Sequence, residues 1–535
     1  MSTEKKSSIV SILKSSIGVS FATLASRVLG LLRVRLEAMV LGGGDIASGW
    51  FLSFAIPNLL RRVLGEGALG NALMPIVAEL DSKEGRECVR RELGVVFFVL
   101  GAVLGSIVIL VSVISLLLGR VEFFQNISFF STPRMKIMLR LLPLLMPYGF
   151  FMCLVGAAGS VLNYCKEFVL PALGALLLNI FLISGLGVSY YLHVNDVEKV
   201  INILAYLVLI SGFVQLVLML LLLQKQKVCP IFKSVVSLSS FTSGTVKLLF
   251  TTALPGIIGG VATQVSFLVD RMIAVYLGAQ AVPALTYVDR LIDLPIGIFA
   301  VSLGGVLMSS LSRSAANGNM EDFSNELDLS IRHVFFFCIP MAVGVVFFFK
   351  MLMSLLCLGG RYTVQDIYAA EGVALYYGAG IPIFCLLKVL LPAFYSRKKM
   401  NITLYASLCA IVLNIVFNFI LMKKMQQSGI ALATVISSLV NCSILIFILI
   451  REGVLTKVAK PVVCGLRSLI IALASFWLVR LIYPSAAKIE NNWNTAFLHL
   501  VVAGVLFSLL YFGLSAVARA SEMRELISMF KHKKA

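Results

Sequence analysis

The sequence predicts an all-α integral membrane protein with about 14 transmembrane helices. Of its 535 residues, 59% are hydrophobic and only 13% are charged, whereas a soluble domain is about half apolar and about a quarter charged. Runs of about 20 apolar residues recur from Ile17 almost to the C-terminus, each long enough to cross about 30 Å of hydrocarbon as a helix. We therefore expect lipid to cover most of the apolar surface.

The apolar runs form two groups of six and a final pair. The first group is expected at residues 17–41, 46–80, 94–118, 136–163, 169–192 and 200–223. The second group is expected at 246–277, 282–311, 330–356, 370–395, 402–422 and 430–450, and the final pair at 461–482 and 495–516. The short connections leave no room for a folded soluble domain.

The two groups of six resemble copies of one another. Pro147 precedes Asn179 by the interval at which Pro382 precedes Asn414, an offset of 235 positions in both cases. An even number of helices gives the copies one orientation, with a substrate site between them near the bilayer midplane; the alternative is a chance coincidence of common residues. We expect an N-terminal lobe at 1–228, a C-terminal lobe at 229–457, and a final helix pair with a basic tail at 458–535.

Basic residues predict the orientation. They gather at the N-terminus and in alternate connections, so that both termini are expected on the cytoplasmic side; these residues include Lys5, Lys6, Arg90, Arg91, Lys225, Lys233, Arg397, Lys398, Lys531, Lys533 and Lys534. The net charge of +19 comes from short loops and helix interiors rather than from a basic arm with interleaved aromatics. Nucleic acid is therefore not an expected partner.

Ionisable residues concentrate on the first two helices of each group. A charge at the bilayer centre costs roughly 2.5–3.5 kcal/mol on insertion scales, so it needs a partner, a water-filled cavity or a function. Arginine presents a planar fork that matches phosphate oxygens, and convergent arginines would suit an anionic substrate. The alternative, which we favour for Arg35 and Arg62, is a structural ion pair or a side chain that reaches the headgroups. The functional candidates are Arg27, Arg33, Arg61 and Arg290, with Glu37 and Asp293 as local carboxylates at i+4 and i+3.

Motifs that would indicate other functions lack the surrounding sequence pattern that those functions require. Residues 65–70 spell GxGxxG, but no strand precedes them, and the glycines more plausibly break the second helix. The four histidines are scattered and the ten cysteines form no CxxC pair, so neither an enzyme nor a structural metal site is indicated.

Several strings carry a family resemblance. Residues 26–33 read SRVLGLLR, residues 57–62 read PNLLRR, and Asp289-Arg290-Leu291 is followed by Asp293. In these strings, and in order over nearly the whole chain, the sequence resembles the MurJ (MviN) lipid II flippases of the MATE-like (MOP) superfamily. The resemblance implies two six-helix lobes in parallel pseudo-repeat and a terminal helix pair that lines a groove for a lipid tail. It also implies that the protein flips the lipid-linked peptidoglycan precursor from the inner to the outer leaflet of the bacterial cytoplasmic membrane by alternating access.

The resemblance also implies a substrate site. The family's essential arginines fall on Arg27, Arg33, Arg61 and Arg290, with Ser26 beside them and Asp293 as acidic partner. These residues would hold the pyrophosphate of lipid II, an undecaprenyl-linked muropeptide. One position departs from the pattern, because Ser48 stands where the family usually has an acid and Asp45 lies three residues away.

A sodium site is the one cofactor that the resemblance suggests. It would consist of Asp270, Asn414, Asn418, the carbonyl of Ile430 and Thr434, and oxygen ligands suit a hard cation. Asn418 stands where a carboxylate has been seen, which removes one charge. Sodium or the membrane potential would then drive the cycle.

Rival functions remain open at the level of sequence. A flippase for another lipid-linked oligosaccharide would also have to bind phosphate within the membrane. A MATE-like cation-coupled exporter shares the fold but calls for acidic and aromatic cavity walls. Beyond lipid II and membrane lipids, cell-wall synthesis proteins are candidate partners.

Overall fold

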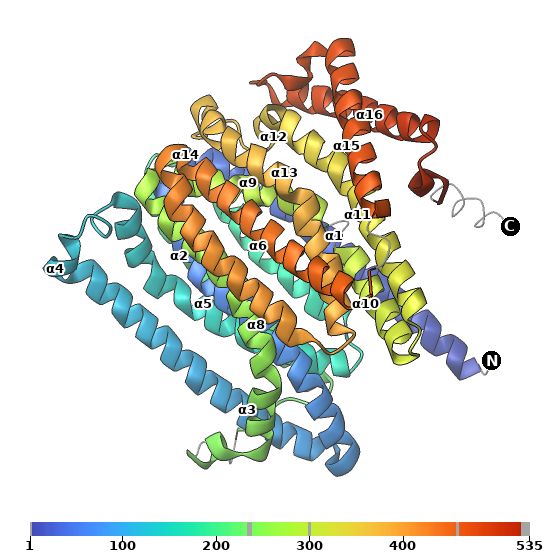
Figure 1. Ribbon diagram of the computed structural model, residues 1–535. Helices are drawn as coiled ribbons and strands as arrows, with labels where there is room; N and C mark the ends of the chain where they lie inside the picture. Colours follow the sequence, from blue (N-terminus) through green and yellow to red (C-terminus); the bar gives the residue numbers. More distant parts are fainter. Residues whose placement is uncertain (1–2, 233–237, 298–300, 456–458, 526–535) are drawn as a thin grey trace. The chain divides into compact units, whose positions relative to one another are not determined.

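The computed structural model describes residues 3–232, 238–297, 301–455 and 459–525. Within these ranges the chain is helical, and the one β feature is an isolated bridge between Gly359 and Tyr362. The chain forms two compact units, Met1–Ala279 and Gln280–Ala535. Figure 1 shows the helices coloured along the sequence. Lys233, Lys531, Lys533 and Lys534, which we count for orientation, lie outside the described residues.

The first unit contains eight α-helices and three short segments of other helix types among its described residues. The α-helices are α1 (Thr3–Leu41), α2 (Asp45–Leu60), α3 (Leu69–Arg120), α4 (Glu122–Gln125), α5 (Pro133–Tyr164), α6 (Val169–Tyr191), α7 (Val197–Lys225) and α8 (Gly244–Ala274). The others are the π-helix η1 (Arg61–Ala68) and the 3-10 helices η2 (Leu238–Thr242) and η3 (Val275–Leu277).

The second unit also contains eight α-helices in its described part. They are α9 (Ala281–Pro295), α10 (Val301–Ala316), α11 (Met320–Phe347), α12 (Phe349–Leu356), α13 (Val364–Tyr395), α14 (Met400–Arg451), α15 (Ala459–Ile482) and α16 (Trp493–Val517), with a 3-10 turn η5 (Pro484–Ala487) between the last two.

The helices lie over the predicted apolar runs, but not one to one. Two pairs of runs merge, the run 46–80 is divided among α2, η1 and the start of α3, and the run 330–356 is divided between α11 and α12. Helix α1 begins at Thr3, before the predicted start at Ile17. The backbone leaves helical geometry at Gly85 inside α3 and at Gln426 inside α14, so each of these 52-residue elements is a pair of helices joined at a kink. Nine helices of the described part are long and apolar enough to cross a membrane. The protein is therefore a multi-pass, all-helical membrane protein, and the count of 14 spans stays a prediction.

Helix α8 packs inside the first unit. It contacts α2, η1 and α3, although its sequence belongs to the second predicted copy. The two compact units are defined by packing, whereas the predicted lobes are defined by a repeat in the sequence. The units therefore do not test the lobe boundary near residue 228, which stays a prediction.

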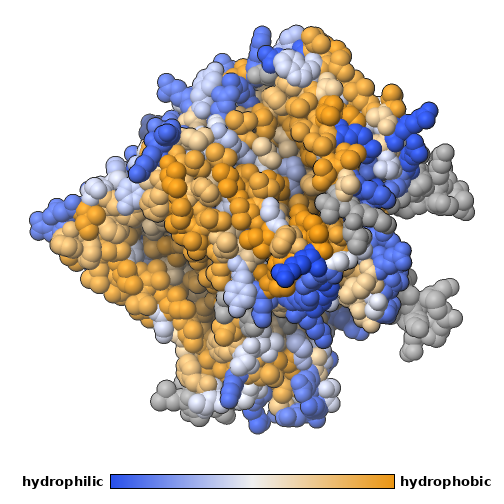
Figure 2. Space-filling view, viewed as in Figure 1, coloured by the Kyte–Doolittle hydropathy of each residue, from blue (hydrophilic) through white to orange (hydrophobic). Residues whose placement is uncertain are grey.

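Each unit has a core of large apolar side chains. In the first unit, Trp50, Tyr148 and Leu204 pack between α2, α5 and α7. In the second unit, Phe336 and Phe476 pack with others between α11, α15 and α16. Many more apolar side chains lie on the surface, as Figure 2 shows, which is stable only against lipid.

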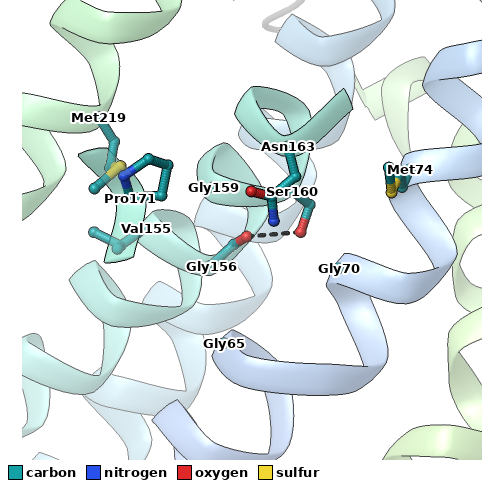
Figure 3. A pocket seen from close by; sticks show the side chains of 10 residues that line it. All are labelled: Gly65, Gly70, Met74, Val155, Gly156, Gly159, Ser160, Asn163, Pro171 and Met219. Atoms are coloured by element: carbon teal, nitrogen blue, oxygen red, sulfur yellow. Dashed lines mark hydrogen bonds between the residues drawn. The ribbon is translucent and has the colours of Figure 1, made fainter. Parts of the chain in front are cut away.

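Glycines allow close helix contact beside η1. A Cβ atom on Gly156 would lie 1.9 Å from the carbonyl oxygen of Gly65, and one on Gly70 would lie 2.4 Å from Ser160 Oγ. These residues line a pocket of about 260 Å³ between η1, α3 and α5 (Figure 3). The expected break in the second helix is therefore a change of helix type: the chain stays helical through Gly65 but in the wider π form.

Ion pairs fasten the ends of the second unit. Glu522, after α16, is buried and pairs with Arg332 of α11 at 3.1 Å and with Arg467 of α15. After α14, Glu452 accepts hydrogen bonds of 2.6 Å from Arg397 and Lys399. The first cluster joins α11 and α15 to the segment after α16, and the second joins the ends of α13 and α14.

Candidate substrate-binding site

Arg33 of α1 is buried, and side chains of two helices contact it. Its Nε lies 3.7 Å from Oε1 of Glu37, one turn further along α1. Its Nη1 donates a hydrogen bond of 3.1 Å to Oδ1 of Asn179 on α6. Arg33 is 8% exposed and Glu37 6%, so both charges are largely withdrawn from the surface of the unit. The predicted i,i+4 pair is confirmed.

Asn179 joins Arg33 to Ser26. The amide Nδ2 donates to the carbonyl oxygen of Ser26 at 3.3 Å and lies 3.5 Å from its hydroxyl. Because α1 and α6 pack along one another, this single amide fixes the guanidinium relative to the SRVLG segment. Its amide is neutral, so the local carboxylate at this cluster is Glu37 and the arginine keeps its affinity for a second anion.

Arg61 stands at the start of the π-helix. Its Nε donates to Oδ1 of Asn58 at 2.9 Å, one turn back in α2. The next residue, Arg62, donates to Oε1 of Gln264 on α8 at 3.4 Å. Both arginines are only partly buried. The PNLLRR string thus presents two cations where α2 changes helix type.

Asp45 and Ser48 have structural partners. Asp45 Oδ1 accepts from Nη1 of the buried Arg134 on α5 at 2.8 Å, and Nε of Arg134 donates to the carbonyl oxygen of Val275 at 2.9 Å. The hydroxyl of Ser48 donates to the carbonyl oxygen of Ala279 at 2.6 Å. These contacts tie α2 and α5 to the chain after α8, and they give the departure at Ser48 a local explanation.

In the second unit, Arg290 and Asp293 lie one turn apart on α9. Arg290 is half-buried and Asp293 is exposed. The helix is anchored one turn before Arg290, where Tyr287 is buried and meets the ring of Tyr362 edge-on at 5.2 Å between centroids.

The predicted sodium ligands of α14 form one hydrogen-bond chain. Asn418 Nδ2 donates to Asn414 Oδ1 at 3.2 Å, Asn414 Nδ2 to Thr434 Oγ1 at 3.3 Å, and Thr434 Oγ1 to the Ile430 carbonyl oxygen at 3.0 Å. Amide, hydroxyl and carbonyl oxygens fit a hard cation. Asp270 is buried in the first unit, and its part in such a site stays a prediction.

Comparison with known proteins decides the family. A family model described as lipid II flippase MurJ matches residues 38–504. The chain belongs to the lipid II flippase MurJ family. A probable lipid II flippase MurJ of Buchnera aphidicola subsp. Schizaphis graminum is 30% identical over 482 residues, which are 89% of this chain and 90% of that one. A lipid II flippase MurJ of Burkholderia cenocepacia is 27% identical, over 83% of this chain and 84% of that one.

Solved structures agree on the fold. A lipid II flippase MurJ in an inward closed conformation has a TM-score of 0.74 at 22% identity and covers 96% of this chain and all of that one. An inward-facing multidrug resistance MATE family transporter has a TM-score of 0.61 at 14% identity, over 80% and 94% of the two chains. The chain therefore has the MurJ fold, which MATE transporters share.

The sequence indicated the charged residues of this MurJ-family chain, but it did not indicate the neutral residue that contacts Arg33. Asn179 entered only as a marker of the repeat, yet it is the residue that contacts both Ser26 and Arg33. Its buried counterpart at the same place in the second copy, Asn414, also holds a side-chain network. The sequence match between the two positions was thus a signal for a buried, hydrogen-bonded amide at each of them.

Proposed function

We propose that the protein flips lipid II from the inner to the outer leaflet of the bacterial cytoplasmic membrane by alternating access. The family match over residues 38–504 carries this proposal. The geometry of α1 supports it, because a buried arginine beside an amide and one carboxylate is suited to a phosphate-bearing ligand.

In this mechanism the pyrophosphate binds Arg27, Arg33, Arg61 and Arg290. Ser26 adds a hydroxyl donor and Asp293 balances Arg290 while the site is empty. Binding would exchange the weak 3.7 Å contact between Arg33 and Glu37 for bidentate bonds to phosphate oxygens. Both termini are cytoplasmic in this proposal, so capture occurs in the inward-open state and release in the outward-open state.

The undecaprenyl tail would stay in lipid beside α15 and α16. Both helices expose long apolar side chains, among them Ile470, Leu481, Leu498 and Leu509. Such a surface accepts a polyprenyl chain without desolvating any polar group.

The cation that drives the cycle would be sodium, held by Asp270, Asn414, Asn418, the Ile430 carbonyl and Thr434. It would supply positive charge, and the amides would turn their oxygens toward it. The membrane potential alone is a sufficient alternative, since one charge moved through 100 mV changes the free energy by about 2.3 kcal/mol.

Depletion of the protein tests the function. We expect lipid II to accumulate on the inner leaflet and an Arg33→Ala variant to leave that block in place while inserting normally. Arg35→Ala, two residues further along α1, is the matched control and should restore flipping. Accumulation of a different lipid-linked intermediate would show that the substrate is another lipid-linked oligosaccharide and not lipid II. Full rescue by Arg33→Ala would show that Arg33 is not part of the substrate site.

A further inference from the structure

A basic pocket lies at one end of the first unit, apart from the arginines of α1 and η1. It has a volume of about 490 Å³ and opens between the end of α3 and the start of α5. Three cationic side chains line it: Arg120 from the last turn of α3, and Lys136 and Arg140 from α5. Its remaining walls are mostly apolar, formed by Leu116, Leu118, Phe130 and Leu139, with Ser115, Gly119 and Gln125.

Hydrogen bonds hold the walls of this pocket in place. The buried hydroxyl of Ser115 donates to the carbonyl oxygen of Leu139 at 2.8 Å and ties α3 to α5. The amide of Gln125 donates to the carbonyl oxygen of Gly119 at 2.8 Å and ties α4 to the end of α3. The concave shape is thus built into the packing of three helices.

The charge of the pocket is unbalanced. Lys136 and Arg140 are like charges at i and i+4, an arrangement that disfavours the helix unless an anion lies between them. Arg140 has a partner in Glu198, at 2.7 Å, whereas Arg120 and Lys136 form no ion pair within the part of the chain that the structure describes. The N-terminus of α5, which begins at Pro133, adds the positive end of a helix dipole.

The position of the pocket identifies the kind of anion. The turns of α3 just before Arg120 expose Ile109, Leu110, Val113 and Leu117 by 46–66%, as a helix does against hydrocarbon. The apolar run ends at Arg120, so the cations stand at headgroup level. Figure 2 shows the same transition, with hydrophilic side chains at the tip formed around α4 and hydrophobic ones beside it.

The pocket shares its end of the unit with the connection between α1 and α2, because Asp45 pairs with Arg134 in the first turn of α5. In the orientation predicted from the basic loops, this end faces the outer leaflet. Basic residues are disfavoured there by the bias that places them on the cytoplasmic side, so three of them around one cavity call for a functional reason.

We propose that this pocket binds the phosphate of an anionic phospholipid headgroup, with the acyl chains along the exposed face of α3. Arg120 and Lys136 contact the phosphate, Arg140 joins them from its pair with Glu198, and the apolar walls cover the glycerol. The site is independent of the substrate site and of the identity of the substrate.

Native mass spectrometry of the delipidated full-length protein tests the proposal. Phosphatidylglycerol and phosphatidylcholine are titrated as probes, and we expect the anionic lipid to bind more tightly. In Arg120→Gln/Lys136→Gln this preference should fall about 25-fold, at about fivefold per basic residue near an anionic surface. The control Arg480→Gln/Lys488→Gln neutralises two exposed cations at the connection of α15 and α16 and should keep the preference.

Four results would overturn the proposal. They are equal binding of the two lipids, retention of the preference in the pocket variant, its loss in the control variant, and displacement of phosphatidylglycerol by millimolar inorganic phosphate. The last would make the pocket a site for free phosphate. The four side chains are exposed, so both variants are expected to fold, and an unchanged unfolding temperature verifies it.

Discussion

Replacement of Asn179 by aspartate tests whether the charge around Arg33 matters separately from the position of its side chain. The new carboxylate would occupy the place of an amide oxygen that lies 3.1 Å from Nη1 of Arg33, with a similar volume. With the charge centres about 4 Å apart and an effective dielectric constant of about 20, their attraction is about 4 kcal/mol. With Glu37 also present, the cluster changes from neutral to net negative.

We expect Asn179→Asp to fold and insert normally and to lose flipping. The arginine would be occupied by two carboxylates, and capture of a pyrophosphate would weaken by up to about 10³-fold, the equivalent of 4 kcal/mol. Binding of undecaprenyl pyrophosphate to the purified variant, together with rescue of a depleted strain, measures the effect. The unfolding temperature should stay within a few degrees of wild type, because the hydrogen bond becomes charge-assisted.

Asn179→Ser is the matched variant that shortens the side chain without adding charge. Its free energy of pyrophosphate binding should weaken by at most about 1.5–3 kcal/mol, the value of a hydrogen bond to a charged group. Binding should therefore stay measurable. If Asn179→Asp binds the pyrophosphate as wild type does, Arg33 takes no part in capture. If the serine variant is as defective as the aspartate variant, the amide acts through geometry and the electrostatic argument is wrong.

Three further predictions concern stability. Glu522→Gln should lower the unfolding temperature in a thermal scan, because loss of one partner of a buried ion pair costs about 3–5 kcal/mol and leaves Arg332 without that carboxylate; an unchanged temperature would show that the pair contributes nothing. Burial would raise the pKa of Glu452, but its two basic partners lower it, so its stabilisation is present above the ordinary carboxyl pKa and is lost as pH falls through the lowered one. Glu452→Gln should therefore flatten the acid limb of stability against pH, and an unaltered limb would contradict this. Gly156→Ala should destabilise the first unit by about 1–3 kcal/mol, since the added carbon meets the Gly65 carbonyl oxygen, whereas Gly101→Ala, where nothing lies within 4 Å, should be neutral in the same scan.

The sequence was most informative where an interaction is local. The Arg33 and Glu37 pair follows from helical spacing alone and is present at 3.7 Å. The approximate positions of most helices likewise follow from apolar runs, because a helix in lipid satisfies its own backbone and needs only length and hydrophobicity. The kinks at Gly85 and Gln426 were the places where two predicted runs joined into one element.

Contacts between residues far apart in the sequence could not be predicted from residue spacing. Asn179 is 146 positions from Arg33, and Arg134 is 89 positions from Asp45, so neither pairing leaves a periodic trace. The π form of η1 was missed for the same reason. Gly65 suggested a break, but its close contact with Gly156 of α5 joins residues 91 positions apart and exists only in the folded bundle.

The π-helix η1 gives the polypeptide between α2 and α3 a register that differs from that of its neighbours. A hydrogen bond from i to i+5 accommodates one surplus residue per wide turn, and one residue corresponds to about 100° of rotation in an α-helix. Tightening of η1 by a single residue would thus swing the Arg61 side chain by roughly a quarter turn relative to α3, with little change in the length of the rod. By the same arithmetic, this segment can absorb a one-residue deletion by returning to α-helical geometry.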